Sequence, residues 1–132
     1  MPNECYTYFK ITGSFDPDEI TRRLGLQPYE TEPRRLHPLL GTPIPADWCA
    51  CLCDDYTPYV EEQMRRTIAP LLDQTHALNA LQREFGAECW LMIVPTIRKD
   101  EPTPCLAPPM DVIDFCHSTR TQIDIDLYIE GD

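Results

Sequence analysis

The chain has 132 residues, the size of a single domain, and its 22 acidic and 11 basic residues give a formal net charge of −11. This balance disfavours nucleic acid as the main ligand, because nucleic-acid binding depends on clustered Lys and Arg. No stretch approaches the roughly 18 consecutive apolar residues of a membrane span, and the first residues lack the basic and apolar regions of a signal peptide. We therefore expect one cytoplasmic α+β domain over residues 1–132, with no nucleic-acid or membrane partner.

The chain begins with a predicted strand and a short predicted helix. Residues 6–11 alternate in polarity, as a strand with two unlike faces does. Asp16 is typical of a helix N-cap, Pro17 of the first helical position, and Glu19 of a capping box. Gly25 is typical of the C-terminal end of that helix. We expect a helix of about two turns between Asp16 and Gly25.

Two segments are too rich in proline for regular secondary structure. They cover residues 28–47 and residues 95–109. Proline lacks a backbone donor and has a fixed φ, which disfavours both helix interiors and central strands. Both segments are therefore expected to be loops, and loops of this length often carry function.

The other expected elements are a strand at 48–54, a helical region at 57–85, a strand at 89–94, a short helix at 110–117 and a strand at 122–129. Pro70 should kink the helical region or divide it in two. The last strand alternates, with these apolar residues expected inward: Ile123, Ile125, Leu127 and Ile129.

Strands with one apolar face, interleaved with helices, predict a two-layer α+β sandwich with about four strands and helices packed mainly on one face. The other face of that sheet would be partly open. The residues expected on it, beside Met92, are Tyr6, Tyr8, Trp90, Asp124, Asp126 and Tyr128.

Several short segments resemble a known family. They are Ile11–Gly13, Leu24–Leu26 and Ile123–Tyr128, with Asp16 and Trp48 between them. This pattern is similar to a family of small bacterial proteins catalogued as domain of unknown function 4279. The resemblance implies a compact cytoplasmic α+β domain and brings no activity, cofactor or catalytic residues. The stretch Cys116–Thr119 departs from the glycine-containing turn expected before the last strand.

Cys49, Cys51 and Cys53 raise the question of a metal or redox site. Alternate residues of a strand lie roughly 6.5 Å apart, so three sulfurs in one row cannot share a tetrahedral ion. Small apolar residues on a packed strand face are the favoured interpretation. A site that borrows Cys5, Cys89 or His117 from a neighbouring element stays open, and no metal or other cofactor is predicted.

Two charged patterns have a weak functional interpretation. Asp124 and Asp126 are compatible with a bound cation, but the polar face of any solvated strand has the same pattern. The segment Arg34–His37 is compatible with an anion, but its arginines have acidic neighbours in the sequence. Neither pattern is accompanied by a recognised catalytic motif.

Two function classes follow. The favoured one is a non-enzymatic protein-binding or interaction module, because tyrosine, tryptophan and carboxylate side chains on an open sheet face suit a protein partner or a homodimer. Neutralisation of a basic partner, such as a nuclease, is one version of this module. The alternative is a metal-binding protein or a thiol-based enzyme that uses the cysteines. No catalytic residue is predicted for the favoured class.

Overall fold

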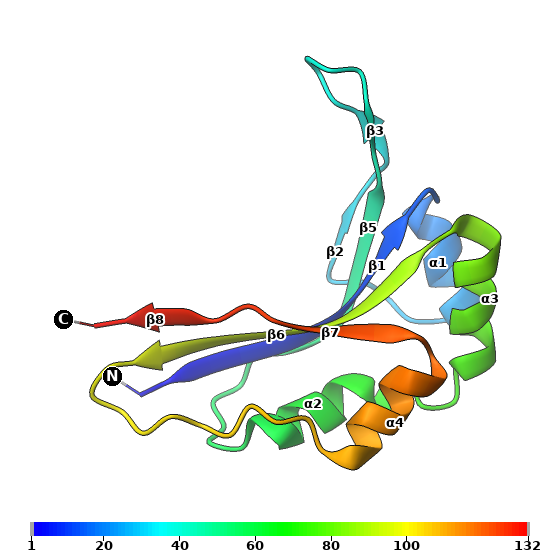
Figure 1. Cartoon of the computed structure of the whole chain (residues 1–132). Coiled ribbons are helices and arrows are strands. Elements are labelled where there is room, and N and C mark those ends of the chain that lie inside the picture. Colours follow the sequence, from blue (N-terminus) through cyan, green and yellow to red (C-terminus); the bar gives the residue numbers. More distant parts are fainter. Residues whose placement is uncertain (1, 132) are drawn as a thin grey trace.

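The computed structural model describes residues 2–131 and shows an α+β fold in which helices cover one face of a sheet (Figure 1). The sheet has six strands, in the order β2-β5-β1-β6-β7, with β8 also paired to β6. Its strands are β1 (Glu4–Gly13), β2 (Glu30–Glu32), β5 (Ala46–Cys53), β6 (Glu88–Arg98), β7 (Thr121–Ile125) and β8 (Tyr128–Glu130). The prediction of about four strands was therefore too low, because β2 lies in an expected loop and the last strand is divided.

The helices are α1 (Pro17–Leu24), α2 (Val60–Ile68), α3 (Thr75–Phe85) and α4 (Met110–Ser118), with the 3-10 turn η1 (Ala69–Leu71) after α2. The break between α2 and α3 confirms the effect predicted for Pro70. Every second residue of β1 and β6 points toward the helices, so Phe9, Ile11, Leu91 and Ile93 are fully buried in the core. The other face of the sheet has no helix over it (Figure 1).

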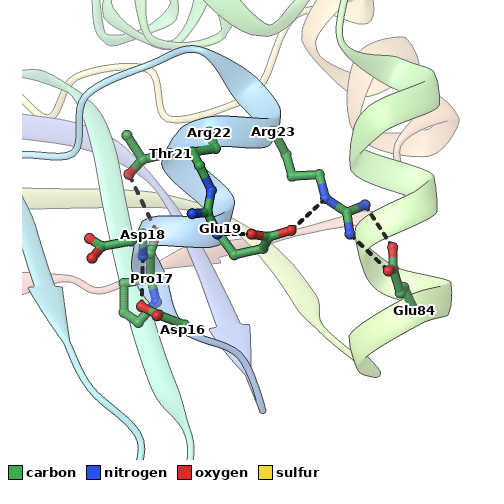
Figure 2. A network of polar contacts seen from close by, with 8 residues as sticks. All are labelled: Asp16, Pro17, Asp18, Glu19, Thr21, Arg22, Arg23 and Glu84. Atoms are coloured by element: carbon green, nitrogen blue, oxygen red, sulfur yellow. Dashed lines mark hydrogen bonds and ion pairs between the residues drawn. The ribbon is translucent and has the colours of Figure 1, made fainter.

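Helix α1 has the ends that were predicted. The side chain of Asp16 accepts a hydrogen bond from the Asp18 backbone N–H at 3.0 Å, and Gly25 has a φ of 65°. Glu19 behaves differently from the expected capping box: its carboxylate pairs with Arg22 and Arg23 instead (Figure 2). Basic side chains one turn further along the helix therefore compete successfully for this carboxylate.

Arg23 also joins α1 to α3. Its guanidinium donates two hydrogen bonds to the carboxylate of Glu84, at 2.7 and 2.8 Å (Figure 2). The same group lies over the ring of Phe85. Paired N–H donors match the two oxygens of a carboxylate, so this contact orients the two helices.

The expected proline-rich loops are shorter than predicted. Residues 28–47 contain β2 and a small hairpin of β3 (Arg35–Leu36) and β4 (Pro43–Ile44), which projects from the end of β5 (Figure 1). Residues 95–98 continue β6, so the second loop starts at residue 99. The causes differ: β2 is at an edge of the sheet and β3 and β4 form a short ladder, where proline is tolerated, whereas Pro95 in β6 lies opposite the break between β7 and β8.

A β-bulge alters the predicted faces of β5. Thr7 pairs with Cys53 and Phe9 pairs with Ala50, so β5 has one residue more than β1 in this interval. Cys51 sits in the bulge with a φ of 61° and packs on the core. Leu52 is consequently 39 % exposed, although alternation predicted it beside the buried Ala50.

The last strand is interrupted between β7 and β8, opposite Pro95. The Asp126 N–H donates to the Ile93 carbonyl at 2.8 Å, so the backbone polar groups of Ile93 face this edge of the sheet. Residues two apart in a strand direct their backbone N–H and C=O groups to the same side, so those of Ile93 and Pro95 point toward β7 and β8. Proline has no N–H, so one hydrogen bond of this ladder cannot form. Around the break Ile125, Leu127 and Ile129 are 39 %, 48 % and 64 % exposed, contrary to the inward position predicted for all three.

Candidate interaction surface

The face of the sheet that the helices leave open, called the open face below, is defined by the even-numbered residues of β1 and β6. Directly paired residues point to the same side of a sheet, so the pairing of Tyr6 with Val94, Tyr8 with Met92 and Lys10 with Trp90 places them together. The pairing of Met92 with Asp124 extends the open face to β7. Strands β5 and β2 contribute as well, because Cys49 and Glu30 pair in the same row as Lys10, and β8 contributes Tyr128, which pairs with Thr96.

Three aromatic side chains form a cluster on the open face. The rings of Tyr6 and Tyr8 stack with their centroids 6.0 Å apart, and Tyr29 meets Tyr8 edge-on at 5.8 Å. Tyr6 and Tyr29 are 42 % and 44 % exposed. We call these three residues the tyrosine cluster; its members come from β1 and from the segment that precedes β2.

Tyr29 was not among the predicted surface residues. It lies in the segment that the sequence indicated as a loop, so strand alternation offered no signal for it. Its backbone N–H donates to the Cys49 carbonyl at 2.9 Å, which starts the β2 pairing and brings the ring over Tyr8. Only this edge pairing, which depends on the tertiary fold, reveals the third member of the cluster.

The predicted aspartates and Tyr128 lie at the β7–β8 side of the open face. Tyr128 is 52 % exposed, and its hydroxyl donates to the Asp126 carboxylate at 3.2 Å. This hydrogen bond raises the pKa of the Tyr128 hydroxyl. Asp126 is exposed and close enough to Tyr8 to affect its ionisation, whereas Asp124 is half-buried. The structure thus brings Asp126 and Tyr128 together with the tyrosine cluster.

Trp90 and Met92 are on the same face but contribute less surface. Trp90 is partly buried one row further along from Tyr8, and among residues 2–131 no ring contact links it to the tyrosine cluster. Met92 is only 7 % exposed. These two residues therefore lie beneath the exposed side chains of this face and offer a partner little accessible area.

The charge on the open face is strongly negative. Cross-strand pairing places these carboxylates on it: Glu4, Glu30, Glu32, Asp47, Glu88, Asp124 and Glu130. Asp126 joins them through its hydrogen bond with Tyr128 and its effect on Tyr8. The basic residues that the same pairing places there are Lys10 and Arg98. Arg98 is already bound to Glu130 and lies 3.6 Å from Glu4. Most of the negative charge is therefore left without a basic neighbour on this face.

Ionisation of the tyrosines is suppressed. Burial, followed by ionisable neighbours that include Cys49, Glu30 and Asp126, raises the pKa of Tyr8 to about 12. Burial also raises the pKa of Tyr29. Both side chains stay neutral well above neutral pH, so they offer a ring and a hydroxyl donor rather than a phenolate.

Five of the seven cysteines have raised pKa values, unlike reactive thiols. All seven are unpaired. Burial raises the pKa of Cys5, Cys49, Cys51 and Cys116 to about 11, and that of Cys89 to about 12. Catalytic thiols need the opposite shift. Within residues 2–131, no group of three His, Cys, Asp or Glu side chains is arranged to hold a metal ion.

A cleft of about 550 Å³ lies at the N-terminal end of β1. Its lining includes Cys5, Tyr56, Tyr59 and the loop at 101–105. The sequence did not indicate this cleft, because its walls come from three segments that are distant in the chain.

Among the described residues, no helix is long and apolar enough to cross a membrane.

Comparison with known proteins identifies the family. A family model described as Domain of unknown function (DUF4279) matches residues 3–130, which is nearly the whole chain and agrees with the resemblance seen in the sequence. No curated protein and no solved structure matches the chain.

Proposed function

The chain belongs to the DUF4279 family, whose description states no activity, and we propose from its surface that it is a non-enzymatic interaction module that binds a basic protein partner through the open face. The observation that carries this proposal is the coincidence of the tyrosine cluster with unpaired carboxylates on one helix-free surface. The same proposal places the protein in the cytoplasm, where reduced thiols such as its seven unpaired cysteines are stable.

The tyrosine cluster supplies contact area. Tyrosine buries a large apolar ring at a small entropic cost and keeps a polar tip that can hydrogen-bond across an interface. Tyr6 and Tyr8 restrict each other by stacking, so much of the ordering that binding would require has already taken place. A partner therefore meets a rigid aromatic surface.

The carboxylates define the chemistry of the partner. Glu30 and Asp126 lie close enough to Tyr8 to affect its ionisation, and Asp47 adds a carboxylate further along the same face. A basic partner gains from this arrangement in association rate and in specificity. A second copy of the chain would bring like charges together, since each copy carries a net charge of −11. Neutralisation of a basic toxin is one function that such a surface would serve.

The proposal is tested with two labelled ten-residue peptides, one alternating arginine with valine and one alternating glutamate with valine. Fluorescence anisotropy measures binding of each peptide to the wild-type protein and to the double variant Asp124→Lys and Asp126→Lys. The arginine peptide should bind, with an affinity that falls as salt is added, and the double variant should lose most of that affinity.

The control must change charge without touching the open face. Asp73 and Asp114 are exposed, lie outside the sheet and form no ion pair among residues 2–131, so Asp73→Lys with Asp114→Lys gives the same net charge as the test variant. Equal loss of affinity in both double variants would contradict the proposal, as would equal binding of the two peptides. Sedimentation of the unliganded protein tests the homodimer. A stable dimer that the open-face variant disrupts would show that the open face binds a second copy of the chain and not a basic partner.

A further inference from the structure

A second cleft lies on the helical side of the molecule, away from the open face. Its volume is about 380 Å³, and it is lined by Asn79, Gln82, Arg83, Ala87 and Arg120. Arg83 lies in the last turn of α3, and Arg120 follows the end of α4 just before β7. The ends of two helices therefore bring two arginines to one small cavity, and none of the described residues that line it carries a carboxylate.

These arginines differ from most others in the chain. Ion pairs engage Arg22, Arg23, Arg35, Arg65, Arg66 and Arg98, whereas within residues 2–131 none is formed by Arg83 or Arg120. The carboxylate next to Arg83 in the chain, Glu84, is held by Arg23. In a protein of net charge −11, two arginines that share a cleft without an acidic partner are an exception that calls for an explanation.

The backbone at Arg120 supplies an independent observation. Arg120 has a φ of 53°, in the left-handed region that favours glycine. It directly follows the C-cap residue Thr119, at the position where helices commonly end with a glycine. An arginine at this φ has a less favourable backbone energy than a glycine would have. Strained backbone of this kind concentrates at functional sites.

Two carboxamides complete the lining. Asn79 Nδ2 donates to the Ser118 carbonyl at 3.1 Å, and Gln82 Nε2 donates to the Thr119 carbonyl at 2.6 Å. These bonds use the amide nitrogens and leave both amide oxygens as acceptors. Asn79 Oδ1 is buried with no hydrogen-bond partner among residues 2–131, a situation that is rare in native proteins. The Asn79 oxygen is enclosed, so the Gln82 oxygen is the acceptor that this lining can offer beside the two arginines.

We propose that this cleft binds a small phosphate-bearing molecule, with Arg83 and Arg120 holding the phosphate and the Gln82 carboxamide oxygen accepting from a neighbouring hydroxyl. Guanidinium groups match the geometry of phosphate oxygens, and two of them balance the charge of a phosphate dianion. A volume near 380 Å³ suits a metabolite rather than a macromolecule. The site is separate from the open face and stands or falls independently of the proposed function.

A simpler role exists for each arginine, since a cation near a helix C-terminus is favoured by the helix dipole. That role needs a positive charge and not a guanidinium. Lysine at either position would preserve it while removing the paired donors. The variants Arg83→Lys and Arg120→Lys therefore separate a phosphate site from dipole compensation.

Isothermal titration calorimetry with inorganic phosphate, glycerol 3-phosphate and acetate tests the proposal on the full chain. Wild-type protein should bind both phosphates, glycerol 3-phosphate more tightly, and acetate at least tenfold more weakly. Arg83→Lys, Arg120→Lys and Arg120→Gly should each lose about tenfold or more in phosphate affinity. Arg34→Gln removes another arginine that has no ion pair among the described residues, and it should bind like the wild type.

Arg120→Gly also guards against a loss that comes only from misfolding. Glycine relieves the left-handed backbone, so this variant should melt no lower than the wild type while phosphate binding is lost. The proposal is overturned if wild-type protein binds neither phosphate, if Arg120→Gly binds phosphate normally, or if acetate binds as tightly as phosphate. Equal affinities for inorganic phosphate and glycerol 3-phosphate would refute the role given to the Gln82 acceptor.

Discussion

Gln63 accepts a hydrogen bond of 2.7 Å from the hydroxyl of Thr7, although both side chains are fully buried. The Gln63 amide also donates to the carbonyls of Cys5 and Asp55, at 2.9 and 3.3 Å. Strand β5 ends opposite Thr7, so this part of β1 lacks a neighbour on that side. Helix α2 thus supplies hydrogen bonds that a strand would otherwise make.

Replacing Gln63 by leucine should therefore destabilise the protein by about 1–3 kcal/mol, because a buried hydroxyl and a buried carbonyl lose their partner. Urea unfolding followed by circular dichroism measures this change. Gln27→Leu, at an exposed position, is the matched control and should change stability little. A Gln63→Leu variant as stable as the wild type would show that the network is dispensable.

Stability should decline at high pH because of the tyrosine cluster. The pKa of Tyr8 rises from its ordinary value of 10 to about 12 on folding, and that of Tyr29 is raised as well. Above pH 10 the unfolded chain loses these protons first, so the free energy of unfolding falls as pH rises toward 12. Below pH 10 both states stay protonated and the contribution is complete.

Urea unfolding at pH 9, 10 and 11 should show a loss of stability, to which the buried cysteines contribute from pH 9 and Tyr8 from about pH 10. In Tyr8→Phe the part of the loss above pH 10 should be smaller. Tyr56→Phe changes an exposed tyrosine outside the cluster and should leave the slope unchanged. If both variants had the same slope as the wild type, the suppressed ionisation of Tyr8 would have no thermodynamic consequence.

The bulge at Cys51 makes a prediction about side-chain shape. A β-branched residue is poorly tolerated at a φ of 61°, so Cys51→Val should lower stability by about 1–2 kcal/mol. The same substitution at Cys53, which lies in regular strand pairing with Thr7, is the control. Thermal melting compares the two variants, and a larger loss for Cys53→Val would argue against backbone strain at Cys51.

Thiol labelling should divide the cysteines by exposure. Cys105 is exposed, whereas burial raises the pKa of Cys89 to about 12. At pH 8 a disulfide reagent such as DTNB should therefore modify Cys105 first and leave Cys89 untouched until the protein unfolds. In Cys105→Ser the fast phase should disappear. Labelling of Cys89 in the native protein at the rate of Cys105 would contradict the buried position.

Capping residues and proline in the sequence correctly predicted the helix ends, because these ends are fixed by residues close to them in the chain. Asp16 and Gly25 mark the ends of α1 because capping needs only a short stretch of chain. Pro70 separates α2 from α3 for the same reason. Alternation in β1 correctly assigned Tyr6 and Tyr8 to the face opposite Phe9, because a strand with one buried side has a period of two.

Features that depend on tertiary pairing were not predictable in this way. The bulge at Cys51 moves Leu52 out of the row that alternation assigned to it. Leu127 and Ile129 look like core residues in the sequence, yet no helix extends far enough to cover them. Tyr29 joins the tyrosine cluster only because β2 pairs with β5. Each of these errors concerns a contact between segments that are distant in the chain.

The gap opposite Pro95 also bears on solubility. Continuous edge strands can recruit further strands without limit, which is how many proteins begin to form fibrils. Here the edge offers only two short ladders, divided at Asp126 and flanked by charged side chains. An added strand would find its hydrogen bonds out of phase across that gap. The break opposite Pro95 therefore disfavours polymerisation at this edge, beside the exposed Leu127 and Ile129.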